Sequence, residues 1–308
     1  MSVNMGRWTL KRIEDAFTEF FRRVKRDQKA GFPPYRSRYR WRSFGLLEAS
    51  GLRIKGHYLL LRGITRALRM NLHRPLPLDA TLKGATFTRR GRHWFVSLQI
   101  ESQTIIAATA PAGRAIGLDV GVEHLASWSD GTIDGHVVNA RPRSRRERDL
   151  RLAQRALARC RRGSRRRAKV RERLARVQAS VARQRDTHLH QQAERLARSH
   201  RLIVIEKLSI RNMTRSAAGT VDAPGTNVAA KAGLNRSILD ASMGRFLQYL
   251  RYKAARAGGT VLEVRAAGTS QQCSACGTKV PKTLSIRDHR CGCGLEIQRD
   301  VNAARRRT

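Results

Sequence analysis

Three acidic residues in this 308-residue chain interrupt otherwise apolar stretches. Asp119 and Glu206 each end a short apolar segment with the character of a buried strand, and Asp300 precedes the small residues of a predicted short helix. A buried carboxylate is costly unless it is paired or bound to a cation. Because ligands of α/β sheets collect at the carboxyl ends of strands, two strand ends and one helix start can bring the three carboxylates together.

Three carboxylates that meet in one site need cations, because like charges at short range raise one another's pKa. Mg²⁺ prefers carboxylate oxygens and retains water. Two such ions about 4 Å apart activate a water and stabilise the leaving oxygen of a phosphodiester. We therefore predict that Asp119, Glu206 and Asp300 bind two Mg²⁺ (or Mn²⁺) ions and are the catalytic residues of a metal-dependent nuclease. The alternative is that each acid forms a local salt bridge with one of the many arginines.

A second constellation is formed by two cysteine pairs, CxxC and CxC, which are Cys273, Cys276, Cys291 and Cys293. Two pairs at this separation are typical of a zinc ribbon in a reducing compartment. We predict a structural rather than a catalytic zinc, since four protein ligands leave no open position. His289 is an alternative fourth ligand, and a decayed ribbon with free thiols is the alternative to a metal site. The fifth cysteine, Cys160, is predicted to be an ordinary free thiol.

The charge of the chain is strongly positive, with 63 Lys and Arg against 23 Asp and Glu and a net charge of +40. A compact protein with this charge repels itself unless a polyanion neutralises it. Nucleic acid is the predicted partner, because each neutralised phosphate releases counterions. A basic membrane-surface protein is the rival, but no run approaches the ~20 apolar residues of a membrane span. The N-terminus also lacks the apolar core of a signal peptide.

The first third of the chain is predicted to be one helix followed by a small β unit. Helical spacing of apolar residues covers 8–28, and a period of two follows from 51 to 101. Strands are expected at Leu52/Ile54 and at 58–61, and a hairpin at 87–94 turns at Gly91. This unit is expected to be barrel-like. The basic and aromatic segment 35–44 is either a groove that contacts phosphates and bases or a barrel strand with a solvated face.

The rest of the chain alternates apolar strands with helical patterns. A linker is expected at 102–113. Strands are expected at 115–120, 125–129, 202–205 and 261–264, and a turn at Asp130-Gly131. Helices are expected over 149–199 (a basic hairpin broken near Gly163), 238–257 and 301–306. The charge run 141–148 is expected to be a loop, and the small polar residues 214–230 a mobile loop.

Several of these segments carry a specific resemblance. The block 268–277 with its CxxC pair, the block 291–294 and the block 299–304 resemble the C-terminus of the TnpB (OrfB) proteins of bacterial insertion sequences. Residues 116–121 look like the first RuvC motif of that family, and 204–208 look like the second. Residues 233–253 resemble the helix between the motifs.

The resemblance implies a RuvC (RNase-H-like) nuclease with a zinc ribbon inserted before its last motif. It places Asp119, Glu206 and Asp300 on the positions of the catalytic triad, and the four clustered cysteines on the zinc ligands. It implies a guide RNA and a double-stranded DNA target as partners, with no membrane and no small-molecule substrate. The family is similar to the ancestors of type V CRISPR effectors, and its members work in the bacterial cytoplasm, where we expect nucleoid association.

The expected fold is therefore α/β in three parts. Residues 1–110 form an N-terminal helix and β-barrel lobe, shortened at its N-terminus. Residues 111–268 and 295–308 form the RuvC-like nuclease domain with the helical hairpin 145–199, and 269–294 form the zinc ribbon. The expected function is a transposon-associated RNA-guided DNA endonuclease. The alternatives are a nuclease-impaired nucleic-acid-binding remnant or regulator, and a transposase that joins DNA strands.

Overall fold

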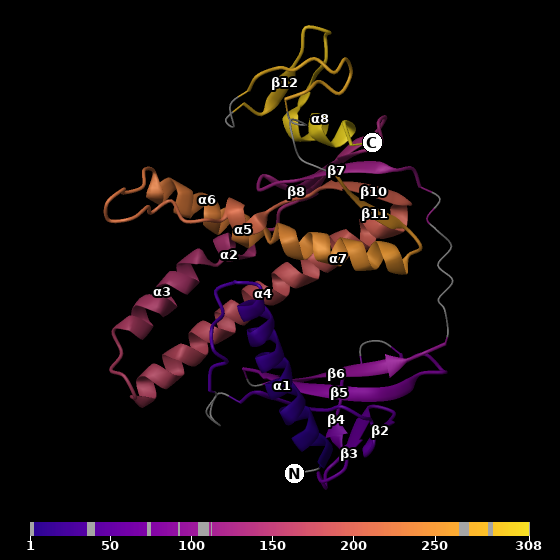
Figure 1. The fold of residues 1–308 in the computed structure, drawn as a ribbon, viewed down its shortest axis with the longest axis vertical. Helices are drawn as coiled ribbons and strands as arrows, with labels where there is room; N and C mark the ends of the chain where they lie inside the picture. Colours follow the sequence, from indigo (N-terminus) through magenta and orange to yellow (C-terminus); the bar gives the residue numbers. More distant parts are fainter. Residues whose placement is uncertain are drawn as a thin grey trace. The chain divides into compact units, whose positions relative to one another are not determined.

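The chain folds into two units, Met1–Ile105 and Ile106–Thr308 (Figure 1). The structure, a computed structural model, describes residues 3–35, 41–72, 75–91, 93–103, 111, 113–264, 271–282 and 286–307. Two interpretations fall largely outside these ranges: residues 36–40 of the basic and aromatic segment, and most of the linker expected at 102–113.

The first unit contains one helix and two small antiparallel sheets. Helix α1 (Val3–Lys25) confirms the helix predicted over 8–28, but it begins five residues earlier and ends three residues earlier than predicted. One sheet has the order β1-β5-β6 and the other β2-β3-β4. Their strands are β1 (Ser43–Leu46), β2 (Leu52–Lys55), β3 (Tyr58–Leu61), β4 (Leu68–Arg69), β5 (Thr81–Arg90) and β6 (His93–Glu101).

The predicted strands and hairpin of this unit are confirmed. Gly91 turns the β5–β6 hairpin with a φ of 62°, a left-handed value that glycine adopts without a steric penalty. The expected barrel differs in its pairing, because the described strands hydrogen-bond as two three-stranded sheets. Leu46, Leu59 and Phe87 belong to one buried core that both sheets share.

The second unit is built on a five-stranded sheet of order β11-β10-β7-β8-β9. Strands β7, β10 and β11 are parallel to one another, and β8 and β9 extend the sheet in antiparallel fashion. The strands are β7 (Ile116–Val120), β8 (His124–Ser129), β9 (Asp134–Val138), β10 (Leu202–Glu206) and β11 (Thr260–Val264). Four of them were predicted. Strand β9 was missed because it lies at the sheet edge and buries only Val137, so it carries no apolar run.

The helices of this unit, with one further hairpin, complete the mixed α/β architecture. They are α2 (Pro142–Arg145), α3 (Glu147–Ala158), α4 (Arg165–Ser199), α5 (Ile210–Met213), α6 (Val228–Ala241), α7 (Met243–Arg256) and α8 (Arg299–Arg305). Strands β12 (Asp288–Arg290) and β13 (Glu296–Gln298) pair antiparallel just before α8. The predicted break of the long hairpin is confirmed, since Ser164 caps α4 by accepting a hydrogen bond from the Arg167 N–H.

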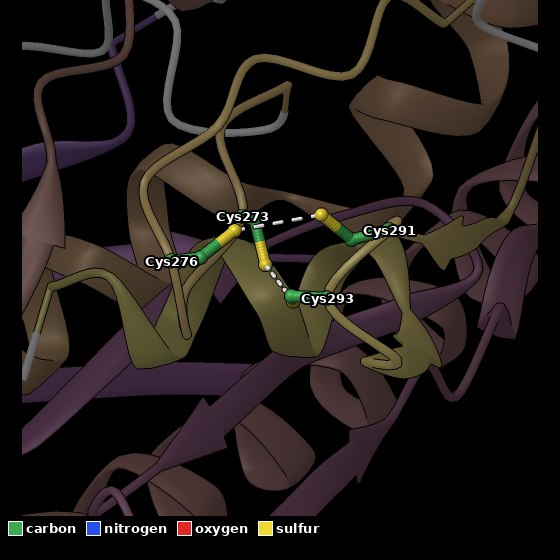
Figure 2. A group of neighbouring side chains, drawn as sticks. All are labelled: Cys273, Cys276, Cys291 and Cys293. Atoms are coloured by element: carbon green, nitrogen blue, oxygen red, sulfur yellow. Dashed lines mark hydrogen bonds between the residues drawn. The ribbon is translucent and has the colours of Figure 1, made fainter.

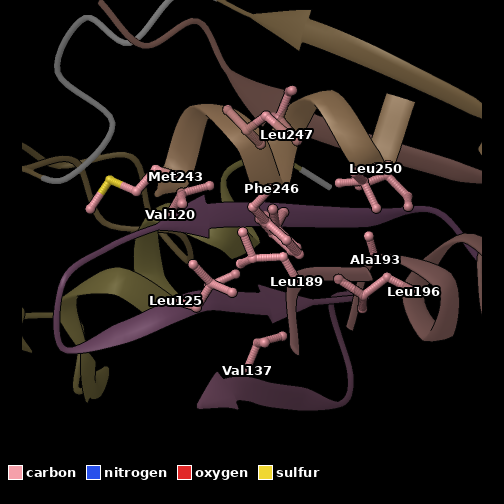
Figure 3. Close-up of a cluster of buried hydrophobic side chains, with 14 of the residues drawn as sticks. Val120, Leu125, Val137, Leu189, Ala193, Leu196, Met243, Phe246, Leu247 and Leu250 are labelled. Atoms are coloured by element: carbon pink, nitrogen blue, oxygen red, sulfur yellow. The ribbon is translucent and has the colours of Figure 1, made fainter. Parts of the chain in front are cut away.

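The two faces of the sheet differ in what covers them. Helices α4 and α7 pack on one face, where Phe246 and Leu189 meet the apolar side chains of the strands (Figure 3). Because side chains alternate along a strand, the buried Ile116 and Leu118 face this core and Gly117 faces the other side. Helix α8 lies on that other side, against β7 and β8 (Figure 1).

Two loop and helix predictions of the second unit were wrong. The charge run 141–148 is helical because the Asp240 carboxylate accepts hydrogen bonds from the N–H groups of Arg143 (3.0 Å) and Ser144 (3.1 Å). This cap comes from a distant residue and has no local signal in the sequence.

The single helix predicted over 238–257 is two helices, which meet at Ser242 with a φ of 53°. Gly244 follows the break by two residues, but a single glycine inside a helical pattern does not by itself predict a helix end.

Among the described residues, no helix combines the length and the apolar composition that crossing a bilayer requires.

Asp240 generates a testable prediction about stability, because it also pairs with Arg185 at 2.8 Å and is only 6% exposed. Asp240→Ala leaves a half-buried guanidinium and two helix N–H groups without their acceptor, so we expect a loss of about 3 kcal/mol in unfolding free energy. Urea denaturation measures it. The matched control, Asp186→Ala, breaks an ion pair with Arg245 whose side chains are 33% and 50% exposed, and should cost about 1 kcal/mol or less. Equal losses would contradict the capping role.

Candidate functional site

Asp119 and Glu206 lie at the carboxyl ends of the neighbouring parallel strands β7 and β10. Both carboxylates contact the same guanidinium group, that of Arg307. Arg307 donates from Nη1 to Asp119 Oδ1 at 2.8 Å and from Nη2 to Glu206 Oε2 at 2.5 Å. Its side chain is 1% exposed, and it also donates to the backbone carbonyl of Leu118. The structure therefore brings two of the three predicted acids onto one buried guanidinium.

Asp300 reaches the same region from the first turn of α8. A Cβ atom built on Gly121, just after β7, would lie 3.8 Å from Asp300 Oδ2, so this carboxylate borders the end of the strand that carries Asp119. Arg299 Nε lies 3.5 Å from Asp300 Oδ1. The charge of Asp300 also contributes to the raised pKa of Asp119. The three acids come from three separate elements, as the sequence predicted.

Burial is the main cause of the raised pKa values at this site. It raises the pKa of Asp119, and Arg307 opposes that shift. Burial also raises the pKa of Glu206, where Arg307 again opposes the shift and Asp119 adds to it. Burial thus disfavours the ionised forms of Asp119 and Glu206 more than Arg307 favours them.

The donor set suits a hard divalent cation, since it consists of carboxylate oxygens. Asp119, Glu206 and Asp300 are the residues that would hold such an ion. An ion bound by Asp119 and Glu206 competes with Arg307 for the same two carboxylates. Sequence reasoning missed Arg307, because it belongs to an ordinary run of three arginines with no distinguishing local pattern.

A polar row beside Asp119 was also missed. Across β7, β8 and β9, Asp119 is opposite Ser127, and Ser127 is opposite His136. Ser127 Oγ and His136 Nδ1 are 3.1 Å apart, and the rings of His136 and His124 stack with centroids 4.3 Å apart. Burial and the nearby His124 lower the pKa of His136, which favours a neutral imidazole next to the acids. The undetected strand β9 explains the omission.

The four clustered cysteines converge, as predicted (Figure 2). Their sulfur atoms all lie within 4.8 Å of one another, with Cys273 and Cys293 at 3.7 Å and Cys276 and Cys291 at 3.5 Å. Zinc–sulfur bonds of about 2.3 Å in tetrahedral geometry separate the sulfurs by about 3.8 Å. The spacing is thus compatible with one structural zinc held by all four. His289 is not in this cluster, and its ring nitrogen Nδ1 contacts Lys282 instead.

The surroundings of two of these cysteines shift their pKa values in opposite directions. Hydrogen bonds from Thr278 lower the pKa of Cys276 to about 6. The Leu295 N–H lowers the pKa of Cys293, but the neighbouring sulfurs outweigh it and raise that pKa to about 12. Four thiolates at this spacing cannot all ionise unless a metal compensates their charge. Cys160 lies apart, on the basic hairpin, and donates to the Ala156 carbonyl at 3.2 Å.

Comparison with known proteins places these features in a family. The OrfB_IS605 family, described as a probable transposase, matches residues 96–217, and the "Cas12f1-like, TNB domain" family matches residues 244–306. "Putative RNA-guided DNA endonuclease InsQ" of Escherichia coli (strain K12) is 34% identical over 299 residues, covering 96% of this chain and 71% of that protein. A "Putative RNA-guided DNA endonuclease" of Streptomyces pristinaespiralis is 33% identical over 301 residues, covering 96% of this chain and 68% of that protein.

The chain belongs to the TnpB (OrfB) family. Among solved structures, this TnpB-family chain is similar to the one in the cryo-EM structure of the Cas12f1-sgRNA-target DNA complex. The TM-score is 0.42 at 15% identity, with 72% of this chain and 55% of that chain covered. A CRISPR-Cas12f ternary complex gives 0.41 at 17% identity, with 74% and 46% covered.

The cysteine cluster of this TnpB-family chain predicts one tightly bound zinc per molecule. Cys276→Ser should lose most of that zinc, because one of four thiolates is replaced by a poor ligand. Mass spectrometry of the metal content of purified protein measures the ratio. Cys160→Ser is the matched control and should retain one zinc. Wild-type protein that folds without zinc would refute the metal site.

Arg307 generates a prediction about the metal-free protein. Arg307→Ala leaves Asp119 and Glu206 without their shared counterion, so the loss in unfolding free energy should be about 3 kcal/mol near neutral pH. The variant raises the folded-state pKa of both acids further. Its deficit should therefore be smallest below their unfolded pKa values, near pH 4, and grow as the pH rises through the folded ones.

Adding Mn²⁺ provides the second readout, since a divalent cation can replace the lost charge. The unfolding temperature of Arg307→Ala should rise more on addition of Mn²⁺ than that of the wild type, measured at one pH in zinc-loaded protein. Arg305→Ala is the control on the same helix; it breaks an ion pair with Asp134 and should not change the response to Mn²⁺. A response of Arg307→Ala no larger than the wild type's would contradict competition for these carboxylates.

Proposed function

We propose that the chain is a transposon-associated, RNA-guided DNA endonuclease that hydrolyses phosphodiester bonds in a RuvC-like site. The observation that carries the proposal is the meeting of Asp119 and Glu206 on one buried guanidinium, with Asp300 beside them. The names of the relatives from Escherichia coli and Streptomyces pristinaespiralis support the same activity.

The sheet topology supports the RuvC-like (RNase-H-like) assignment. Three antiparallel strands, β7 to β9, are followed by two strands that join parallel to β7 on its other side, with helices as the connections. In such a sheet the carboxyl ends of the parallel strands are where ligands bind. Asp119 and Glu206 occupy two of those ends. The proposed nuclease domain comprises 111–268 and 295–308, with 269–294 as its zinc ribbon and 1–110 as a separate lobe.

The residues of this chain have distinct tasks under the proposal. Asp119, Glu206 and Asp300 would hold two Mg²⁺ or Mn²⁺ ions, which would supply an activated water and stabilisation of the leaving oxygen of a phosphodiester. The side chains of Asp119 and Glu206 are each only 18% exposed, which limits the access of bulk water to the site. The basic helices α3 and α4 bind the backbone of a guide RNA–target DNA duplex, which leaves sequence reading to base pairing.

The direct test is cleavage of a plasmid by the full chain, purified with its co-expressed RNA, in Mg²⁺. The wild type should cut a plasmid that matches the guide, and Asp119→Ala should cut it on the order of a hundredfold or more slowly while still binding it. Glu263→Ala, an acid of the neighbouring strand β11 paired with Arg251, is the matched control and should cut like the wild type. Equal cutting by Asp119→Ala would refute the assignment.

Two other outcomes of the same assay would distinguish the alternative functions. Binding of RNA and DNA by the wild type without any cutting would indicate a nucleic-acid-binding remnant or regulator. Joined rather than cut strands would indicate a transposase, the activity in the description of the family that matches residues 96–217.

A further inference from the structure

Asn302, one turn into α8, connects the helix that carries Asp300 to the cysteine cluster. Its side chain is completely buried. Nδ2 donates to the backbone carbonyl of Gln272 at 2.8 Å, and Oδ1 accepts from the backbone N–H of Ser274 at 2.9 Å. Gln272 and Ser274 flank Cys273, so a single amide side chain grips the backbone on both sides of a cysteine in the cluster.

The two hydrogen bonds of Asn302 complement the other hydrogen bonds of the turn around Cys273. The three residues after Cys273 donate hydrogen bonds from their backbone N–H groups. The N–H of Ser274 donates to Asn302, and the N–H groups of Ala275 and Cys276 donate to the Cys273 sulfur. Arg306, the residue that follows α8, adds a second contact, since its Nη1 donates to the Cys273 carbonyl at 3.3 Å. The same short turn therefore orients a sulfur ligand on one side and holds α8 on the other.

Helix α8 depends on such contacts for its position. With seven residues it is too short to be stable alone, so packing sets where it lies. On its sheet side it approaches β7 very closely, because a Cβ on Gly117 would lie 1.9 Å from the Ala304 carbonyl oxygen. On its other side, α8 contacts the turn around Cys273 through the hydrogen bonds of Asn302. Asp300, two residues before Asn302, is thus placed between the sheet and the cysteine cluster.

We infer that Asn302 is a positioning residue: it transmits the order of the zinc-loaded cysteine cluster to Asp300 and so sets the affinity of the carboxylate site for divalent cations. The inference rests on the proposed function, since it takes the three carboxylates as the metal-binding site. Residues that orient metal ligands without touching the metal change metal affinity by about 10–100-fold. Loss of zinc should weaken cation binding at Asp119, Glu206 and Asp300 through Asn302.

The test measures Mn²⁺ affinity of the full chain by the electron paramagnetic resonance signal of free Mn²⁺, with zinc present and after zinc removal. In the wild type, zinc removal should weaken binding about tenfold. In Asn302→Ala, binding should already be about tenfold weaker with zinc present, and zinc removal should change it little further. Arg290→Ala, which breaks an exposed pair with Glu296 in the same module, is the control and should behave like the wild type.

Two additional measurements keep a folding defect apart from a positioning effect. Cobalt substituted for zinc reports the thiolate site through its absorption spectrum, which should be unchanged in Asn302→Ala. The second variant, Asn302→Asp, keeps the acceptor for Ser274 and loses the donor to Gln272. Its added negative charge alone would tighten Mn²⁺ binding, so weaker binding in this variant supports positioning, and tighter binding counts against it.

The outcomes distinguish this inference from the proposed function. If Mn²⁺ binding in the wild type does not depend on Asp119, tested with Asp119→Ala, the carboxylate metal site and the inference are both overturned. If binding depends on Asp119 but is unaffected by zinc, or if Asn302→Ala responds to zinc as the wild type does, only the role of Asn302 is overturned.

Discussion

The close approach of α8 to strand β7 is the constraint on which the candidate site depends. Gly117 permits it, because any side chain there would collide with the Ala304 carbonyl. The alternation of β7 puts Leu118 into the apolar core and leaves Gly117 and Asp119 on the face that α8 covers. Helix α8 and the turn after it can then supply Asp300 and Arg307 to this face, while Asn302 contacts the cysteine cluster on the other side of the helix. The absence of a side chain at Gly117 thus determines which residues can surround Asp119.

The acids were predictable from the sequence because each one breaks a strong local pattern. Asp119 and Glu206 end apolar strands, and strand ends in a parallel sheet meet at one edge. The cysteines were predictable for a similar reason, since their spacing is a property of the local chain. Features that depend on distant partners were not predictable. The Asp240 carboxylate caps a helix almost a hundred residues away, and a charge run consequently forms a helix where a loop was expected.

Arg307 and Asn302 belong to this second class. Arg307 is one arginine among three in a row, and only the fold shows that it is the buried one with two acids as partners. Asn302 was part of the motif that carried the family resemblance, but the resemblance alone assigned it no task. Its task follows from the backbone groups of Gln272 and Ser274, which lie thirty and twenty-eight residues earlier in the chain. Motifs identify such residues, and tertiary contacts are needed to explain them.

The contrast between the site and the rest of the chain has a further electrostatic consequence. The chain carries +40 net charge, which attracts any polyanion, whereas the site gathers three carboxylates. Asp119, Glu206 and Asp300 contribute three negative charges, and Arg307 and Arg299 return two positive ones. A phosphate drawn to the basic surface would thus be repelled at the site itself. Two divalent cations would reverse that sign. Under the proposed function, cation occupancy therefore controls whether a phosphodiester can enter the site, in addition to the chemistry that follows.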